Sequence, residues 1–109
     1  MDYYELESCV EEWATNKGLL NPNNGMKQAL KTLEEVTELM TAIENERMAG
    51  FDADISHGEA IMDAIGDIMV TMIIQANIQG FTLEVCLEHA WHQIKDRTGK
   101  TVNGTFIKD

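Results

Sequence analysis

Residues 60–74, AIMDAIGDIMVTMII, decide the fold of this chain. Twelve of these fifteen residues are apolar or glycine, and the other three, Asp63, Asp67 and Thr71, recur every four residues. At the pitch of an α-helix this spacing places the three polar side chains on one face. Two of them are carboxylates, which are costly to bury without a partner. The stretch therefore predicts a helix that is apolar except for one acidic stripe, whose partner is a base, a proton or a metal ion.

A second acidic pattern lies upstream, in LEEVTEL at residues 33–39. Glu34, Glu35 and Glu38 are three and four residues apart, so one helix face carries all three. If the two helices pack antiparallel, these acids face Asp63 and Asp67, and like charges so close repel unless cations lie among them. Ligands that are all oxygen suit Mg²⁺ or Mn²⁺ rather than Zn²⁺. The two patterns together predict a divalent-cation site, with Glu34 as a supporting or additional ligand.

The same acids have simpler explanations, which the residues alone leave open. Acidic helix faces are often only solvated. A buried acid pair can also be balanced by a base, and Lys27 and Lys31 are the candidates on the same helix. Lys31 is also placed to pair with Glu35, one turn further along the helix.

Length and charge restrict the function classes. The 109 residues suffice for one domain, 1–109, and are too few for two. Eight basic residues against nineteen acidic ones give a net charge of −11, which repels nucleic acid backbones, so we expect no nucleic-acid partner. An acidic amino terminus without signal-peptide character, and no apolar run of membrane-span length, predict a cytoplasmic protein without a membrane partner. Cys9 and Cys86 are expected to be reduced core thiols.

Hydrophobic periodicity and turn signals predict an all-α fold, a four-helix bundle with a short C-terminal β-hairpin. The expected elements are a helix capped by Asp2 and stopped at Gly18, a helix from about Met26 to Ala49, a helix opened by a Ser56–Glu59 capping box and closed at Gly80, a helix from about Leu83 to Arg97, and a hairpin around Asn103-Gly104.

Packing expectations follow from the same periodicity. The buried seam of the second helix is expected to be Met26, Leu30, Leu33, Thr37, Met40 and Ile43–Glu44, and the inner face of the fourth Val85, Cys86, Ala90 and Ile94. Glu7 is expected to be solvated. The third helix has no polar side apart from its acidic stripe and needs more cover than three short helices give, so we expect a homodimer or homotetramer.

LEEVTEL followed by DAIGD at 63–67 resembles the MazG-type, all-α nucleoside triphosphate pyrophosphohydrolases, whose signature is a Glu-Glu-x-x-Glu helix and then a helix with an acidic pair ending in Asp. WATNKGLL, KQALKTLEEVTEL, DAIGDIMVTMII and IKDRTGK before the Asn-Gly turn are similar to the short stand-alone MazG-like proteins often carried by phages. The resemblance covers nearly the whole chain. It implies a MazG-like bundle and a nucleotide-pool enzyme that hydrolyses a (d)NTP between the α and β phosphates, releasing (d)NMP and pyrophosphate.

Carried over by position, the resemblance makes Glu35, Glu38 and Asp67 metal ligands. Either Glu35 or Glu38 would also be catalytic, by orienting the attacking water. The family has Glu where this chain has Ala64, so Asp63 is expected to supply the missing carboxylate.

Basic residues are the expected contacts of the phosphates. Lys31, Lys95 and Arg97 are placed to neutralise the outgoing pyrophosphate. His92, at a position where many relatives carry Asn, is a further candidate substrate contact. Favourable placement of Lys95 and Arg97 at a helix C-terminus is the simpler alternative.

Two other functions compete with this one. A di-iron carboxylate bundle needs Glu-x-x-His on two helices, and the chain has no such helical pair. A non-enzymatic helical interaction module whose acids hold a structural cation stays open. Trp13, Phe51 and Trp91 are possible base-stacking residues, although such side chains more often belong to a core. The base, the sugar, the number of metal ions and the choice between dimer and tetramer are not decided by the sequence.

Overall fold

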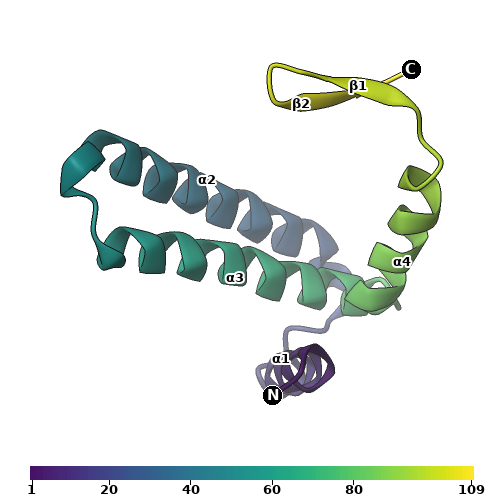
Figure 1. The fold of residues 1–109 in the computed structure, drawn as a ribbon. Helices are drawn as coiled ribbons and strands as arrows, with labels where there is room; N and C mark the ends of the chain where they lie inside the picture. Colours follow the sequence, from purple (N-terminus) through teal and green to yellow (C-terminus); the bar gives the residue numbers. More distant parts are fainter.

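The computed structural model describes all residues, 1–109. Its elements are α1 (Tyr3–Asn16), a 3-10 turn (Pro22–Asn24), α2 (Gly25–Ala49), a second 3-10 turn (Gly50–Asp52), α3 (Ile55–Ile78), α4 (Leu83–Ile94), β1 (Gly99–Val102) and β2 (Thr105–Lys108), as Figure 1 shows. Four helices and a small C-terminal hairpin confirm the predicted elements, although α4 ends at Ile94 rather than near Arg97.

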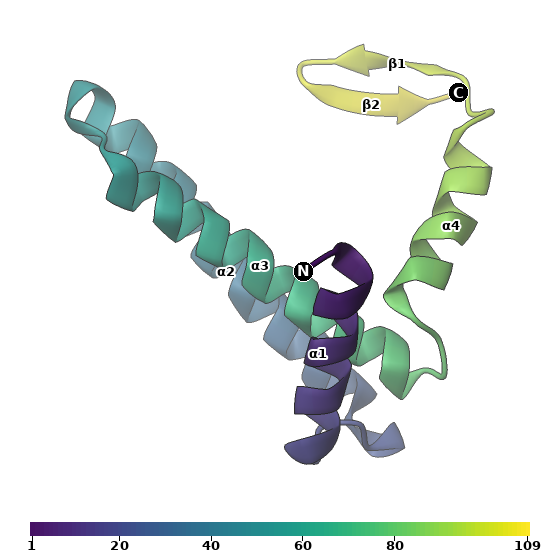
Figure 2. The ribbon, with the colours of Figure 1, turned by 60° about the horizontal axis from the view of Figure 1, so that its bottom comes forward.

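An antiparallel pair of helices, α2 and α3, forms the body of the molecule (Figures 1 and 2). Ala42 and Ala64 are among the few buried side chains, and both are small enough to let the helix backbones come close. The hydroxyls of Thr32 on α2 and Thr71 on α3 hydrogen-bond across the contact at 2.9 Å. Polar and small residues therefore share this interface with apolar ones.

The predicted seam of α2 was wrong. Met26, Leu30 and Leu33 are 75%, 60% and 62% exposed. The face that α3 covers instead carries the buried Glu35 and Ala42. A helix periodicity shows that one face is apolar, but it does not show which neighbour covers that face. In the single chain this apolar stripe of α2 has no cover.

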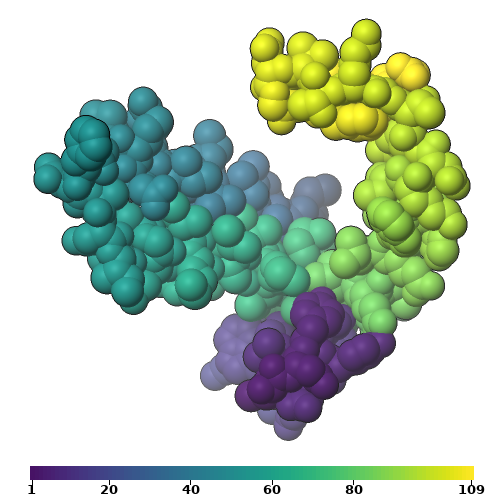
Figure 3. All heavy atoms as spheres, viewed as in Figure 1, coloured from purple at the N-terminus to yellow at the C-terminus, as the bar shows by residue number.

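The four helices do not close into the predicted bundle. The radius of gyration is 16.6 Å, whereas a compact domain of this length measures about 13 Å. Only nine of 109 residues are buried. Helix α1 packs on α3, while α4 and the hairpin lead away and give the C-shaped outline in Figure 3. No residue of α4 is buried, so its predicted inner face is exposed, and so are Cys9 and Cys86.

Glu7 is buried, at 4% exposure, although it was expected to be solvated. Its Oε1 accepts a hydrogen bond from the backbone N–H of Leu83 at 3.2 Å, at the first residue of α4. A carboxylate is favoured at a helix N-terminus, where backbone N–H groups lack partners. The contact joins residues 76 positions apart, which a local sequence pattern does not reveal.

The local signals at the helix ends were partly right. Asp2 caps α1 by accepting from the N–H of Glu5 at 2.8 Å, as predicted. The N-cap of α3 is Asp54 rather than Ser56, because the Asp54 carboxylate accepts from the N–H of Ser56 and His57 Nδ1 accepts from the N–H of Asp54. Asn103 and Gly104 both have positive φ angles, 50° and 80°, which form the expected two-residue hairpin turn.

Helix α3 also meets a length and composition test for a membrane span, contrary to expectation. It has 24 residues, and an 18-residue window of it has a mean hydropathy of 1.4. One such helix is weak evidence, because the core helix of a soluble protein passes the same test. This helix also contains Asp63 and Asp67, and ionisable groups are rare and costly inside a bilayer.

The Asp54 cap generates a prediction that separates charge from hydrogen bonding. Hydrogen bonds from the Ser56 hydroxyl and then from the Ser56 backbone N–H lower the pKa of Asp54. A carboxyl with a lowered pKa contributes stability above its unfolded pKa and loses it as the pH falls through the folded pKa. Asp54→Ala should therefore lower the melting temperature at neutral pH, and the difference from wild type should shrink in acid.

Asp54→Asn is the matched control, because Asn also caps helices but carries no charge. At neutral pH this variant should melt close to the wild-type temperature. Its melting temperature should also fall less than that of wild type as the pH is lowered. The measurement is thermal unfolding by circular dichroism across the acid range. Equal melting temperatures for Asp54→Ala and wild type would show that the cap does not stabilise α3.

Candidate metal and nucleotide site

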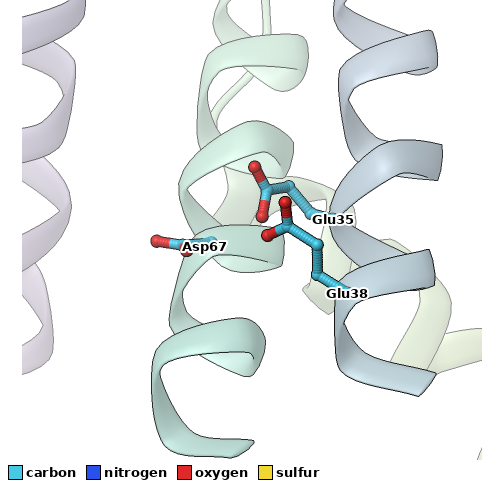
Figure 4. Close-up of side chains that lie close together, drawn as sticks. All are labelled: Glu35, Glu38 and Asp67. Carbon is cyan, nitrogen blue, oxygen red and sulfur yellow. The ribbon is translucent and has the colours of Figure 1, made fainter. Parts of the chain in front are cut away.

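Three carboxylates converge between α2 and α3. Glu35 and Glu38 extend from α2 and Asp67 from α3 (Figure 4), and one oxygen of each lies within 4.8 Å of the others. We call these three residues the acid cluster. Glu35 is buried, whereas Glu38 and Asp67 are exposed, so one side of the cluster is open to solvent.

Glu35 is the residue that makes the cluster more than a solvated acidic face. Its side chain is only 9% exposed, and its Oε1 lies 3.3 Å from Lys31 Nζ. Its Oε2 is buried with no hydrogen-bond partner. A buried carboxylate oxygen without a partner is costly, and a cation among the three acids would satisfy it. The donor set, all oxygen, fits a hard divalent ion.

Electrostatic strain within the cluster has a clear origin. The neighbouring Glu35 carboxylate raises the pKa of Glu38, first through the close contact of the two side chains and then through the repulsion between their charges. Lys31 relieves part of the negative charge, because it pairs with Glu34 at 3.4 Å and with Glu35 at 3.3 Å. These contacts, the one to Glu35 first, raise the pKa of Lys31. The ion pair considered as an alternative thus exists, but it leaves Glu35 Oε2, Glu38 and Asp67 without a base.

Asp63 does not belong to the acid cluster. It is exposed on α3, one turn before Asp67, while its neighbour Ala64 is buried at 5% exposure. The position where the resemblance expects a Glu therefore lies in the interior and holds a methyl group. A ligand role for Asp63 stays a prediction, and so does one for Glu34, which contacts Lys31 instead.

A cavity of about 380 Å³ adjoins the cluster and contains residues of α1, α2 and α3. Its lining residues are Trp13, Leu19, Gln28, Lys31, Glu35, Asp67, Val70, Thr71 and Ile74. An aromatic and aliphatic wall with a few convergent polar groups is typical of small-molecule sites. The sequence identified Trp13 as a possible stacking residue and placed Thr71 on the polar stripe without a role in a site. It gave no signal for Gln28, because side chains from two helices meet there only in the folded chain.

The basic residues near the end of α4 are not gathered at this site within one chain. His92 lies near Glu88 of its own helix, at 3.7 Å, while Lys95 follows the last residue of α4 and Arg97 lies beyond it. None of the three lines the cavity. Their substrate-binding roles stay predictions.

Comparison with known proteins assigns the family. The sequence model of the MazG nucleotide pyrophosphohydrolase domain matches residues 25–102. This chain belongs to the MazG family. The matched range contains Glu35, Glu38 and Asp67, whereas α1, with Trp13, precedes it. Family membership confirms the resemblance seen in the sequence. MazG enzymes generally depend on divalent metal ions, and the acid cluster agrees with that.

One curated relative is a phage protein without an assigned function. The chain is 29% identical over 75 residues to the uncharacterized 18.2 kDa protein in the rep-hol intergenic region of Haemophilus phage HP1. The match covers 69% of this chain and 40% of the phage protein, so the chain spans less than half of that relative. No solved structure matches the chain.

The charge repulsion inside the MazG acid cluster predicts an unusual stability pattern. Glu38→Gln removes the charge that Glu35 opposes, so without metal the variant should melt at the same temperature as wild type or higher. Wild type should gain about 2.7 kcal/mol when Mg²⁺ reaches a hundred times its dissociation constant. The variant should gain much less. The measurement is a pair of melting curves for each protein, in chelator and in Mg²⁺.

Glu46→Gln is the matched control, because Glu46 is an exposed acid of α2 outside the cluster. It should respond to Mg²⁺ as wild type does. If Glu38 instead stabilised the metal-free protein through an ion pair, its loss would lower the melting temperature in chelator, and Mg²⁺ would change nothing. A large fall in the melting temperature of metal-free Glu38→Gln, with no Mg²⁺ effect on wild type, would therefore refute the metal site.

Proposed function

We propose that this MazG protein is a metal-dependent pyrophosphohydrolase of the nucleotide pool in the cytoplasm, acting on a (d)NTP to give (d)NMP and pyrophosphate. The observation that carries the proposal is the buried, unpaired Glu35 Oε2 in a cluster with two further carboxylates, next to a cavity that an aromatic side chain lines. We treat residues 1–109 as one functional unit, because α1 forms part of that cavity.

Glu35, Glu38 and Asp67 would hold Mg²⁺, or the similar Mn²⁺, and exposed Asp63 and Glu34 are possible additional ligands. The ion would supply charge neutralisation at the phosphate oxygens and a lowered pKa for a bound water. The open side of the cluster, formed by Glu38 and Asp67, leaves room for a phosphate and for water. A site built only for structure needs no such opening, so the arrangement favours an enzyme over the non-enzymatic module.

The residues of the chain would supply a proton acceptor for the water, a positive charge for the phosphates and a ring for the nucleobase. A water oxygen forms a bond to phosphorus while the P–O bond between the α and β phosphates breaks. Glu38, on the open side of the cluster, is suited to orient the water and accept its proton, with Glu35 as the alternative. Lys31 lies at the cavity wall beside the acids, where it can bind the phosphate chain. Trp13 offers a ring on which a nucleobase can stack.

A homodimer or homotetramer is the second part of the proposal. Uncovered apolar side chains on α2 and α4, and the small number of buried residues, support it. Monomeric proteins rarely expose contiguous apolar surface on this scale.

The activity is tested with a panel of the eight common ribo- and deoxyribonucleoside triphosphates in Mg²⁺, resolved by chromatography. The expected products are monophosphate and intact pyrophosphate in equal amounts, and Glu38→Gln should abolish them. Glu46→Gln should retain wild-type activity. Diphosphate and inorganic phosphate from a pure preparation would contradict α–β cleavage, and no turnover of any nucleotide would contradict the enzyme.

The oligomer is tested by light scattering at micromolar concentration. We expect a mass of two or four chains, because the exposed stripe of α2 needs a partner surface. Leu30→Glu and Leu33→Glu place charges on that stripe and should shift the mass downward, whereas the exposed substitution Glu46→Gln should not. A stable wild-type mass of 12.3 kDa would show that the single chain is the whole assembly.

A further inference from the structure

One hydrogen-bonded contact between α2 and α3 lies close to the acid cluster. Thr32 on α2 and Thr71 on α3 have their hydroxyl oxygens 2.9 Å apart. The Gln28 amide of α2 supports this contact, because its Nε2 donates to the backbone carbonyl of Thr71 at 3.3 Å. Thr71 is buried at 4% exposure, so little water competes for these bonds. We call the bond between the two hydroxyls the threonine contact.

The threonine contact has a definite donor. A hydroxyl carries a single hydrogen, and Thr71 donates its own to the backbone carbonyl of Ile68 at 2.7 Å. The Thr71 oxygen therefore accepts in this contact, and Thr32 is the donor. Thr32 has an alternative acceptor on its own helix, the Gln28 carbonyl at 3.1 Å, which is the usual kind of partner for a Thr within a helix. Loss of the Thr32 hydroxyl therefore leaves no buried hydrogen-bond donor without a partner.

Both threonines lie one helical turn from an acid of the cluster. Thr32 precedes Glu35 by three residues, and Thr71 follows Asp67 by four. A slip of one helix along the other by a single residue would move its acids by about 1.5 Å. Metal ligands need to be held within about 0.5 Å of their working positions. The register of α2 against α3 therefore decides whether carboxylates of both helices can hold one ion.

Other forces at this interface do not select the register by themselves. Repulsion between the acids of α2 and α3 opposes their approach. Burial of apolar surface is non-directional, and the buried Ala42 and Ala64 contribute only methyl groups. A hydrogen bond depends on both distance and angle. The threonine contact therefore favours the observed register over a shifted one.

We propose that Thr32 is a positioning residue of the acid cluster: its bond to Thr71 holds α2 and α3 in the register in which carboxylates of both helices reach one metal ion. Thr32 acts through the helix pair and does not line the cavity. The metal-binding part rests on the proposed function, whereas the control of the register does not, and the two parts are tested separately.

Metal binding is tested without nucleotide or turnover, by titration of each protein with Mn²⁺ followed by electron paramagnetic resonance. Thr32→Val keeps the branched shape of the side chain but removes its hydroxyl. It should weaken Mn²⁺ binding by about tenfold, as loss of residues that orient metal ligands does. Its melting temperature in chelator should stay close to that of wild type, because no buried donor loses its partner. Thr32→Ser keeps the hydroxyl and should bind Mn²⁺ with nearly the wild-type affinity.

Thr41→Val is the matched control, because the Thr41 hydroxyl donates to the Thr37 carbonyl of its own helix, at 3.1 Å, and to no residue of α3. It follows Glu38 by three residues, just as Thr32 precedes Glu35 by three. This variant should bind Mn²⁺ as wild type does. Wild-type affinity in Thr32→Val, or equal losses in Thr32→Val and Thr41→Val, would overturn the proposal.

Thr71→Val removes the same bond from the α3 side, and it keeps the test decisive if Thr32→Val does not fold. Because both changes remove one shared bond, the double variant Thr32→Val/Thr71→Val should bind Mn²⁺ about as well as the weaker of the two single variants. If the two fold-losses multiplied in the double variant, the hydroxyls would act independently, and the threonine contact would not be the cause.

The register itself is tested in chelator, through the charge of Asp67, which lies near the acids of α2 only in the observed register. At low ionic strength, where repulsion is least screened, Asp67→Asn should raise the melting temperature when it is added to the control Thr41→Val. Added to Thr32→Val, the same substitution should raise the melting temperature less, because a shifted register already separates the charges. Equal gains in the two backgrounds would overturn the proposal.

The two measurements fail independently. If wild type binds no Mn²⁺, the metal site and the proposed function fail together, while the comparison in chelator still decides whether Thr32 sets the register.

Discussion

The carboxylate of Glu35, buried between α2 and α3, is the constraint on which the other features of the site depend. Close packing of the two helices around Ala42 and Ala64 places it in the interface, and Lys31 satisfies only one of its two oxygens. The remaining oxygen and the nearby Glu38 and Asp67 form a concentration of negative charge that a divalent cation would relieve. The feature that is costly for folding is thus also the feature that suits metal binding.

Helix α1 shapes the surroundings of the acid cluster. Helix α1 precedes the region matched by the family, yet its Trp13 lines the cavity beside the acid cluster, and its Glu7 anchors the start of α4. A segment outside the family pattern therefore shapes the cavity next to the cluster.

The single chain leaves apolar surface uncovered, and its charge is unevenly distributed along the sequence. Residues 1–94 contain four bases and seventeen acids, residues 95–109 contain four bases and two acids, and apolar stripes on α2 and α4 have no cover within the chain. Electrostatic complementarity directs which surfaces meet, while apolar contact supplies most of the stabilisation.

Local physical chemistry let the sequence alone determine the elements and the acid pattern. Each of these signals is local to one element, so helical periodicity and turn preferences suffice to predict it. Examples are the acids of each helix (Glu35 and Glu38 on one, Asp67 on the other), the Asp2 cap and the Asn103-Gly104 turn. Contacts between distant segments decided the rest. The burial of Glu7, the exposed stripe at Leu30 and Leu33, the placement of Asp63 outside the cluster and the open bundle all depend on which helix face meets which neighbour. Helical periodicity defines the faces, but only tertiary packing pairs them.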